Sequence, residues 1–220
     1  MTKPATGLSL LVIVLLTLAM SSNGHDISDS LRLLDDKLSD YNKMLRPIRN
    51  QSDTLTVQIG LDLVSIQEFE EKDERISYTG ILIMSWKEEL FTWDPDKYGG
   101  VKNIEVDSTT LWIPHIINTN AVGSVNQISN DWQMVNVTHQ GFASYWVGNV
   151  FTSSCHVDVT YYPWDRQSCQ LNFMLVNYDF SKLTPWPLSK TVMTNFYEES
   201  RAFWIAPLQP MAPLQCLQSS

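Results

Sequence analysis

The chain has 220 residues, with 24 acidic and 15 basic side chains and a formal net charge of −9. This balance argues against nucleic acid and anionic membranes as partners, and it favours cations or basic surfaces. An acidic surface can also serve only to keep an extracellular protein in solution, and the charge alone does not separate these two interpretations.

The N-terminus has the pattern of a secretory signal peptide. Lys3 precedes an apolar run over residues 8–20, which is followed by small and polar residues. This run is too short to span a bilayer, and no later apolar stretch approaches the length of about 20 residues that a membrane helix needs. We therefore expect residues 1–24 to be removed and the mature chain to be soluble and secreted into extracellular fluid, where disulfides persist. Sequons at Asn50 and Asn136 are then predicted glycosylation sites.

The mature chain is predicted to form one β domain over residues 25–206, with an irregular, proline-rich tail over 207–220. Asp26 or Ser28 can cap an N-terminal helix that Pro47 stops. The apolar residues expected on one face of this helix are Ile27, Leu31, Leu34, Leu38 and Tyr41. Strands are predicted at 55–63, 76–86, 108–114, 124–128, 132–138, 145–152, 157–162 and 170–176. Many short strands after one helix predict an all-β fold, an immunoglobulin-like β-sandwich with an N-terminal helix.

Two cysteines bracket a short segment with an unusual interior. Cys155 and Cys169 enclose thirteen residues, with Pro163 between aromatic side chains. A bond between them would restrain the unfolded chain by about 3 kcal/mol on the chain-entropy model. The spacing and the Tyr-Pro-Trp-Asp-Arg-Gln core resemble the signature loop of the Cys-loop receptors, although an unrelated secreted disulfide is the alternative. The resemblance implies that these two cysteines are bonded and that Cys216 is free or joined to another chain.

Further segments extend the resemblance over about residues 31–204. Residues 86–94 are similar to the Trp-x-Asp-x-x-Leu-x-Trp segment of nicotinic extracellular domains, and 111–120 resemble their Leu-Trp-x-Pro-Asp-x-x-x-Tyr-Asn. Asn-Tyr-Asp at 177–179 is similar to the Thr-Tyr-Asp that follows the loop. Without membrane segments, the chain resembles the molluscan acetylcholine-binding protein family. The resemblance implies a homo-oligomer, either a pentamer or stacked pentamers.

The resemblance also locates an acetylcholine site, which in this family is a cage of aromatic rings because a quaternary ammonium binds against ring faces. At the matching positions this chain has Thr119 for a tyrosine, and Val176 and Ile81 for tryptophans. The vicinal cysteines of the third ligand loop have no counterpart. Tyr178 offers a single ring. Each ring contributes about 0.5–2 kcal/mol, so we expect this degenerate cage to bind acetylcholine poorly.

Catalysis is not expected, because the four histidines lack metal-ligand spacing and no hydrolase motif occurs. Acidic clusters stand out instead. The largest is expected in the connection between the first two strands and comprises Glu68, Glu70, Glu71, Asp73 and Glu74. Smaller acidic pairs occur at 35–36, 88–89, 94 with 96, and 198–199. Such oxygen ligands suit weak calcium binding, although each cluster taken singly also fits a solvated surface.

A secreted, acidic relative without the cage is similar to the amorphous calcium carbonate-binding proteins of molluscan shell-forming fluid. This resemblance implies binding of calcium ions or calcium carbonate mineral and a restraining role in shell biomineralisation. Two alternatives remain open. One is a soluble cholinergic ligand-binding protein with a remodelled pocket, and the other is an interaction subunit of a mixed pentamer.

Overall fold

The computed structural model describes residues 26–162, 164, 167–188 and 204–205. The predicted signal peptide, the C-terminal tail and Cys216 lie outside these residues. The elements are α2 (Ile27–Leu38), β1 (Leu55–Glu70), β2 (Arg75–Lys87), the 3₁₀ helix η1 (Pro95–Tyr98), β3 (Asn103–Asp107), β4 (Ile116–Asn118), β5 (Met134–Thr138), β6 (Phe142–Ser154), β7 (Ser168–Cys169), β8 (Phe173–Leu175), β9 (Leu183–Pro187) and β10 (Trp204–Ile205). The predicted fold class, mostly β with an N-terminal helix, is confirmed.

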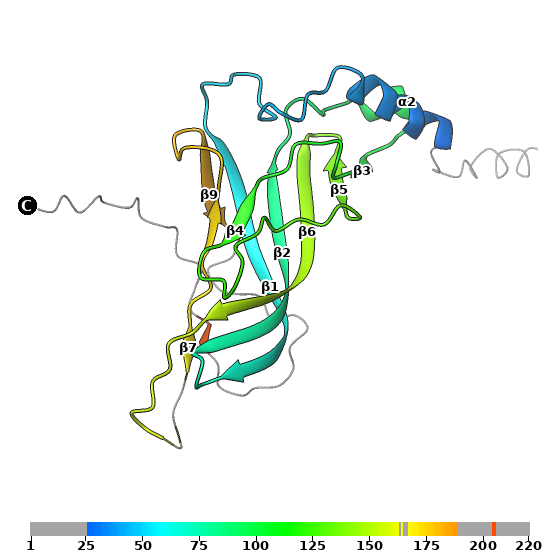
Figure 1. Ribbon diagram of the computed structural model, residues 1–220. Coiled ribbons are helices and arrows are strands. Elements are labelled where there is room, and N and C mark those ends of the chain that lie inside the picture. The colour runs from blue at the N-terminus through cyan, green and yellow to red at the C-terminus, as the bar shows by residue number, and fades with distance from the viewer. Residues whose placement is uncertain (1–25, 163, 165–166, 189–203, 206–220) are drawn as a thin grey trace, which may run out of the picture.

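Six strands form the main sheet in the order β3-β5-β6-β2-β1-β9. All neighbours in it are antiparallel except β1 and β9, which run parallel. Two small pairs, β4 with β8 and β7 with β10, complete the described strands. Figure 1 shows α2 at one end of the sheet and the Cys loop, in yellow, extending from the opposite end.

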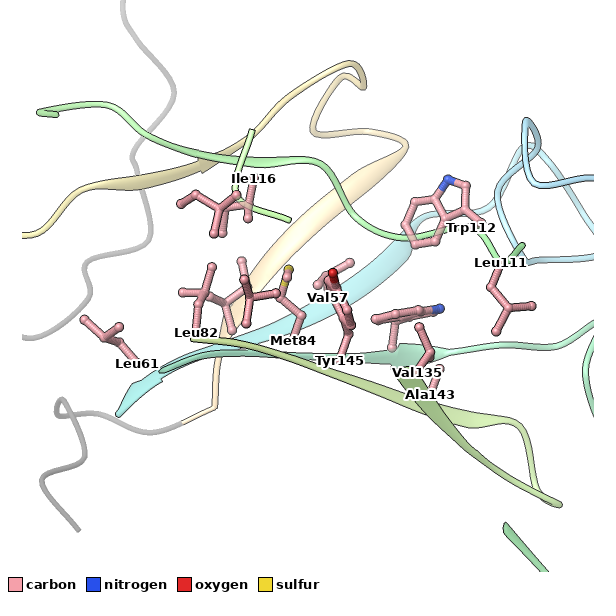
Figure 2. Close-up of a cluster of buried hydrophobic side chains, with 14 of the residues drawn as sticks. Val57, Leu61, Leu82, Met84, Leu111, Trp112, Ile116, Val135, Ala143 and Tyr145 are labelled. Carbon is pink, nitrogen blue, oxygen red and sulfur yellow. The ribbon is translucent and has the colours of Figure 1, made fainter. Parts of the chain in front are cut away.

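The core lies between the inner face of the main sheet and the β4–β8 pair. Alternate residues of the central strands are buried, as the period-two pattern predicts; they include Leu82, Met84 and Trp86 on β2 and Ala143, Tyr145 and Val147 on β6. Figure 2 shows Ile116 of β4 and Trp112 facing Leu82, Met84, Ala143 and Tyr145 across the core. Full burial of each large apolar side chain contributes about 1.5–3 kcal/mol, so the two layers are held together mainly by this cluster.

Three of the predicted strands are wrong. Residues 108–114 form no strand, and Leu111 and Trp112 are both buried in an irregular segment. Residues 124–128 are mostly exposed and form only an isolated bridge, between Gln127 and Ile117. Residues 157–162 belong to the Cys loop, where the Tyr162 amide donates to the Val159 carbonyl in a turn.

The predicted helix is present but shorter, and it buries a different residue. It ends at Leu38, well before Pro47. Leu33 is fully buried, whereas Ile27 and Leu31 on the predicted apolar face are exposed. The other three predicted residues pack, partly buried, against the core; these are Leu34, Leu38 and Tyr41. The helix therefore packs against the core through Leu33 and its C-terminal half, while Arg32 donates to the Lys97 carbonyl at 2.6 Å and lies over the Tyr98 ring.

A buried arginine ties the irregular segment after α2 to the far edge of the sheet. The Arg46 guanidinium donates to the carbonyl oxygens of Asp53 (2.8 Å), Lys182 (2.5 Å) and Gln51. The Leu55 amide donates to the same Lys182 carbonyl at 2.9 Å. These acceptors compensate the cost of burying a charged group, and the planar guanidinium suits several carbonyls at once.

Candidate functional site

Two of the predicted cage positions lie on the β4–β8 pair. Just beyond the paired residues, the Thr119 amide donates to the Asn172 carbonyl at 2.8 Å, and the Val176 amide donates to the His115 carbonyl at 2.9 Å. The Thr119 hydroxyl also donates to the Asn172 carbonyl at 3.2 Å. Both side chains are half-buried. The backbone that would present the rings is thus regular, but neither position carries a ring.

The third position lies on a different sheet. Ile81 sits in the middle of β2, opposite Gly148 on β6 and Asp62 on β1. It is half-buried, and its neighbour Leu82 points into the core. A single chain therefore places the predicted cage positions on two separate sheets and does not gather them into one pocket.

The remaining predicted cage residue, Tyr178, already contacts another aromatic side chain of this chain. Its hydroxyl accepts a hydrogen bond from the Trp112 indole at 3.4 Å, and the two ring centroids are 6.4 Å apart. Trp112 in turn meets Trp86 edge to face, with centroids 5.8 Å apart. Tyr178 thus ends a row of three aromatic side chains, Trp86, Trp112 and Tyr178, that pack against one another at the core. Turning this ring toward a ligand would break the row.

Beside this row lies a buried carboxyl group, which sequence reasoning missed. The sequence predicts Glu88 and Glu89 to be an acidic surface pair, but Glu88 is fully buried. Its Oε2 accepts hydrogen bonds from the Trp86 indole and the Tyr41 hydroxyl, both at 3.3 Å. The Tyr41 hydroxyl accepts one from the Trp112 amide at 3.2 Å. Burial raises the pKa of Glu88 to about 8, because the charged form loses its hydration, and the hydrogen bonds from Trp86, Tyr41 and the Leu90 backbone oppose this only in part.

The raised pKa of Glu88 predicts a pH-dependent stability. In the folded chain the group stays protonated up to about pH 8, whereas in the unfolded chain it ionises near its ordinary value of 4.5. Between these values the folded state binds more protons, so stability falls as pH rises, by at most about 1.4 kcal/mol per pH unit. We expect Glu88→Gln to flatten this dependence, as measured by urea unfolding at pH 5 and pH 8.

The matched control is Glu89→Gln. The Glu89 carboxylate accepts a hydrogen bond from the Arg49 amide at 2.9 Å and is partly exposed. This variant should keep the pH dependence of the parent. If Glu88→Gln and the parent lost stability equally between the two pH values, Glu88 would not be the titrating group.

The acidic cluster at the β1–β2 connection differs from the prediction. Strand β1 runs through Glu70 and β2 begins at Arg75, so Glu68 and Glu70 are strand residues and only 71–74 form the turn. Arg75 forms an ion pair with Glu70 and lies 4.0 Å from the Asp73 carboxylate. Local cations therefore neutralise part of this cluster.

The acidic turn, residues Glu71–Glu74, is exposed and lies at the end of the sheet that carries the Cys loop (Figure 1). The Cys155 amide donates to the Glu74 carbonyl at 2.7 Å, and Glu74 Oε1 lies 3.1 Å from His156 Nδ1. Among the described residues, no group of three or more histidine, cysteine, aspartate or glutamate side chains is arranged to hold a metal ion. The turn therefore offers a negative surface, not a coordination cage.

The Cys loop contains the disulfide that the resemblance implied, between Cys155 and Cys169, and both cysteines are buried. Gln167, also buried, holds the loop closed. Its Oε1 accepts from the Asp158 amide at 3.0 Å, and its Nε2 donates to the Asp158 carbonyl at 3.1 Å. His156 beside the disulfide is exposed and pairs with Glu74. Because Cys155 and Cys169 are bonded to each other, His156 has no free thiol to activate.

Both sequon asparagines lie where a glycan could reach solvent. Asn50 is exposed in the turn before β1, where its Nδ2 donates to Asp53 Oδ1 at 2.8 Å. Asn136 lies in β5 between the buried residues Val135 and Val137, so its side chain points away from the core. Glycosylation of either residue remains a prediction.

Comparison with known proteins identifies the family. The sequence profile described as the neurotransmitter-gated ion-channel ligand binding domain matches residues 30–205. The chain is 35% identical over 151 residues to the acetylcholine receptor subunit alpha-L1 of Schistocerca gregaria, covering 69% of this chain and 27% of that protein. It is 34% identical over 170 residues to the subunit alpha-like 2 of Drosophila melanogaster, covering 77% and 29%.

A vertebrate relative, the neuronal acetylcholine receptor subunit alpha-2 of Rattus norvegicus, is 28% identical over 200 residues. The chain spans less than a third of the length of the two insect relatives, which are named as receptor subunits and not as enzymes. In the described part of the chain, no helix is long and apolar enough to cross a membrane. The profile match, the Cys-loop disulfide and the β fold agree, and the chain belongs to the neurotransmitter-gated ion-channel ligand-binding domain family.

Proposed function

We propose that this chain is an extracellular, acetylcholine-receptor-like domain that has lost the aromatic cage and binds calcium ions, or calcium carbonate mineral, weakly through its acidic turn. The observation that supports the proposal is the exposed group of carboxylates on Glu71, Asp73 and Glu74 at one end of the sheet. In this proposal the chain is secreted and restrains mineral growth in shell formation.

The binding would act through the electric field of the turn. Carboxylate oxygens suit calcium, and open extracellular sites bind it with dissociation constants of about 10⁻⁴ to 10⁻³ M. Lys72 within the turn and Arg75 beside it reduce the negative charge without removing it, because Glu71 has no ion pair among the described residues. If the chain assembles into an oligomer, the weak calcium contacts of each copy of the turn would add through multivalency.

The triple variant Glu71→Gln, Asp73→Asn, Glu74→Gln should lower calcium affinity and weaken inhibition of calcium carbonate crystal growth. Exposed turn substitutions of this kind usually change stability by less than about 0.5 kcal/mol, so folding should be kept. Isothermal titration with calcium and crystal growth rates in supersaturated calcium carbonate measure the two effects. Both should diminish as salt is added, because salt screens exposed charges.

A second triple variant, Asp35→Asn, Asp40→Asn, Asp131→Asn, is the matched control. It removes the same formal charge from exposed residues on other surfaces. If both triple variants weaken binding equally, net charge and not the acidic turn attracts calcium. If the parent chain has no effect on crystal growth, the mineral role is wrong.

A receptor-type role in ligand binding or subunit assembly is the second candidate function. It is favoured by the names of the matched relatives, which are acetylcholine receptor subunits. In this role the chain would either bind a cholinergic ligand in a remodelled pocket or join cage-bearing relatives as an interaction subunit. Titration with acetylcholine separates the first form from the mineral role.

A further inference from the structure

The buried Glu88 carboxyl group is enclosed on one side by a rigid part of the chain. The Glu88 amide donates to the Gly141 carbonyl at 2.7 Å, and a Cβ atom added to Gly141 would lie 2.4 Å from the Glu88 carbonyl oxygen. Gly141 has a φ of +78°, a conformation that favours glycine. Trp86, which donates to the carboxyl group, is paired with Val57 and Ala143 in the main sheet and is buried. This side of the site therefore cannot move without disturbing the sheet.

The other side of the site is closed by Tyr41, which lies in the irregular segment after α2. Its side chain is half-buried, and its hydroxyl donates to Glu88 Oε2 at 3.3 Å. The backbone hydrogen bonds of this segment are short-range, from the Tyr41 amide to the Leu38 carbonyl and from the Leu45 amide to the Asn42 carbonyl, both at 3.2 Å. Segments of this kind open at a lower free energy than core strands. Movement of Tyr41 is therefore the easiest way to bring water to Glu88.

In the described part of the chain, no positively charged side chain pairs with Glu88. The titratable group in contact with it is the Tyr41 hydroxyl, whose pKa is raised by burial and then by the charge of Glu88, so Tyr41 stays neutral. The charged side chains on the adjoining elements have other partners or face solvent: Lys87 donates to the Gln140 carbonyl, Lys43 donates to the Thr109 carbonyl, Glu89 accepts from the Arg49 amide, the His139 ring lies 3.3 Å from the Lys102 carbonyl, and Asp40 is exposed. An ionised Glu88 would therefore lack a compensating charge, which is costly in a buried site.

We propose that Glu88 is a pH-sensitive switch for the segment after α2: its protonated carboxyl group keeps Tyr41 docked, and its ionisation releases Tyr41 together with residues 39–45. Release lets water reach the carboxylate, so that the charge is hydrated and no longer buried. The Tyr41 hydroxyl also accepts from the Trp112 amide at 3.2 Å, and the Trp112 indole donates to Tyr178. Opening at Glu88 thus removes one support of the aromatic row that ends at Tyr178. The switch acts whether or not the chain binds calcium.

The direction of the switch follows from proton binding. While Tyr41 is docked, the pKa of Glu88 is about 8, and once the segment opens and the group is hydrated, the pKa returns toward 4.5. Between these two values opening releases a proton, so the equilibrium constant for opening rises with pH by at most about tenfold per pH unit. Above about pH 8 the group is ionised in both states, and the rise ends. The segment is therefore held most firmly in mildly acidic solution.

Amide hydrogen exchange of the full chain, followed by mass spectrometry at pH 5.5, 6.5 and 7.5, tests the switch. Each rate is divided by the intrinsic exchange rate at the same pH. We expect the protection of residues 39–45 and of the Trp112 amide to fall by about threefold to tenfold per pH unit in the parent. In Glu88→Gln, whose side chain cannot ionise, protection should change by less than about twofold over the whole range. The matched control Glu89→Gln should keep the profile of the parent.

Three results would overturn the proposal. The first is a constant protection of residues 39–45 across this pH range in the parent, a measurement that does not require any variant to fold. The second is an equal dependence on pH in Glu88→Gln and the parent. The third is exchange of residues 39–45 as slow as that of β2 and β6 at every pH, because the segment would then open only when the whole domain unfolds.

Discussion

Replacing Cys155 and Cys169 together by serine is expected to lower the free energy of unfolding by about 2–5 kcal/mol. The disulfide closes the Cys loop, and without it the unfolded chain regains the freedom that the bond removes. Both positions are buried, so the two serine hydroxyls would also need hydrogen-bond partners in the core. We expect secretion to fall as well, because loss of a native disulfide from a secreted domain often prevents folding.

Urea unfolding of the purified variant measures this effect. If too little protein is secreted, unfolding of the parent with and without reductant provides the same comparison. Cys216→Ser is the control, and it should leave stability unchanged because Cys216 is predicted to lie outside this bond. Non-reducing peptide mapping that found Cys216 bonded to either loop cysteine would contradict the prediction.

Acetylcholine and nicotine are expected to bind with dissociation constants no tighter than about 1 mM, which is roughly 4 kcal/mol weaker than micromolar binding. Thr119, Val176 and Ile81 offer no aromatic face to a quaternary ammonium, and each missing ring removes about 0.5–2 kcal/mol. The hydrogen bond and the ring contact between Tyr178 and Trp112 hold the Tyr178 ring in the core.

Isothermal titration with either ligand tests this expectation, and a micromolar dissociation constant would show that the pocket has been remodelled and not lost. The variant Ile81→Trp, Thr119→Tyr, Val176→Trp tests the reason. We expect it to remain a weak binder, because the vicinal cysteines of the third ligand loop have no counterpart in the sequence. The same variant purified with the parent's unfolding midpoint would show that its weakness is not a folding defect.

Alternation in sequence predicted the central strands well, because β2 and β6 bury one face more deeply than the other along most of their length, as does the start of β1. Strand β9 was not predicted. It contains Pro185 and Pro187, which normally argue against a strand, and it is tolerated because it lies at the edge of the sheet, where missing donors cost little. The segment at 157–162 has strand-like composition but exposes Tyr161 and Tyr162 in the Cys loop. Composition alone does not show which residues find a partner strand.

The sequence points to candidate site residues but not to their environment. The resemblance selects Thr119 and Val176, and the structure places both just beyond the paired residues of β4 and β8. The sequence did not reveal that Glu88 is buried, because two adjacent acidic residues are usually expected at the surface. Only the arrangement of Tyr41, Trp86 and Trp112 around it, from three separate parts of the chain, shows the enclosed environment.

The contact between Arg46 and the Lys182 carbonyl has a consequence for the order of folding. These residues are 136 positions apart, and the parallel pairing of β1 with β9 spans a similar distance. A contact of such high sequence separation forms late, because the entropy of closing the intervening chain must be met before the contact stabilises anything. During synthesis, the β1–β2 hairpin can form early, while the edge of β1 stays unpaired until residue 183 and its neighbours have left the ribosome. That interval exposes an open strand edge to other chains, and it is when this domain is most prone to aggregate.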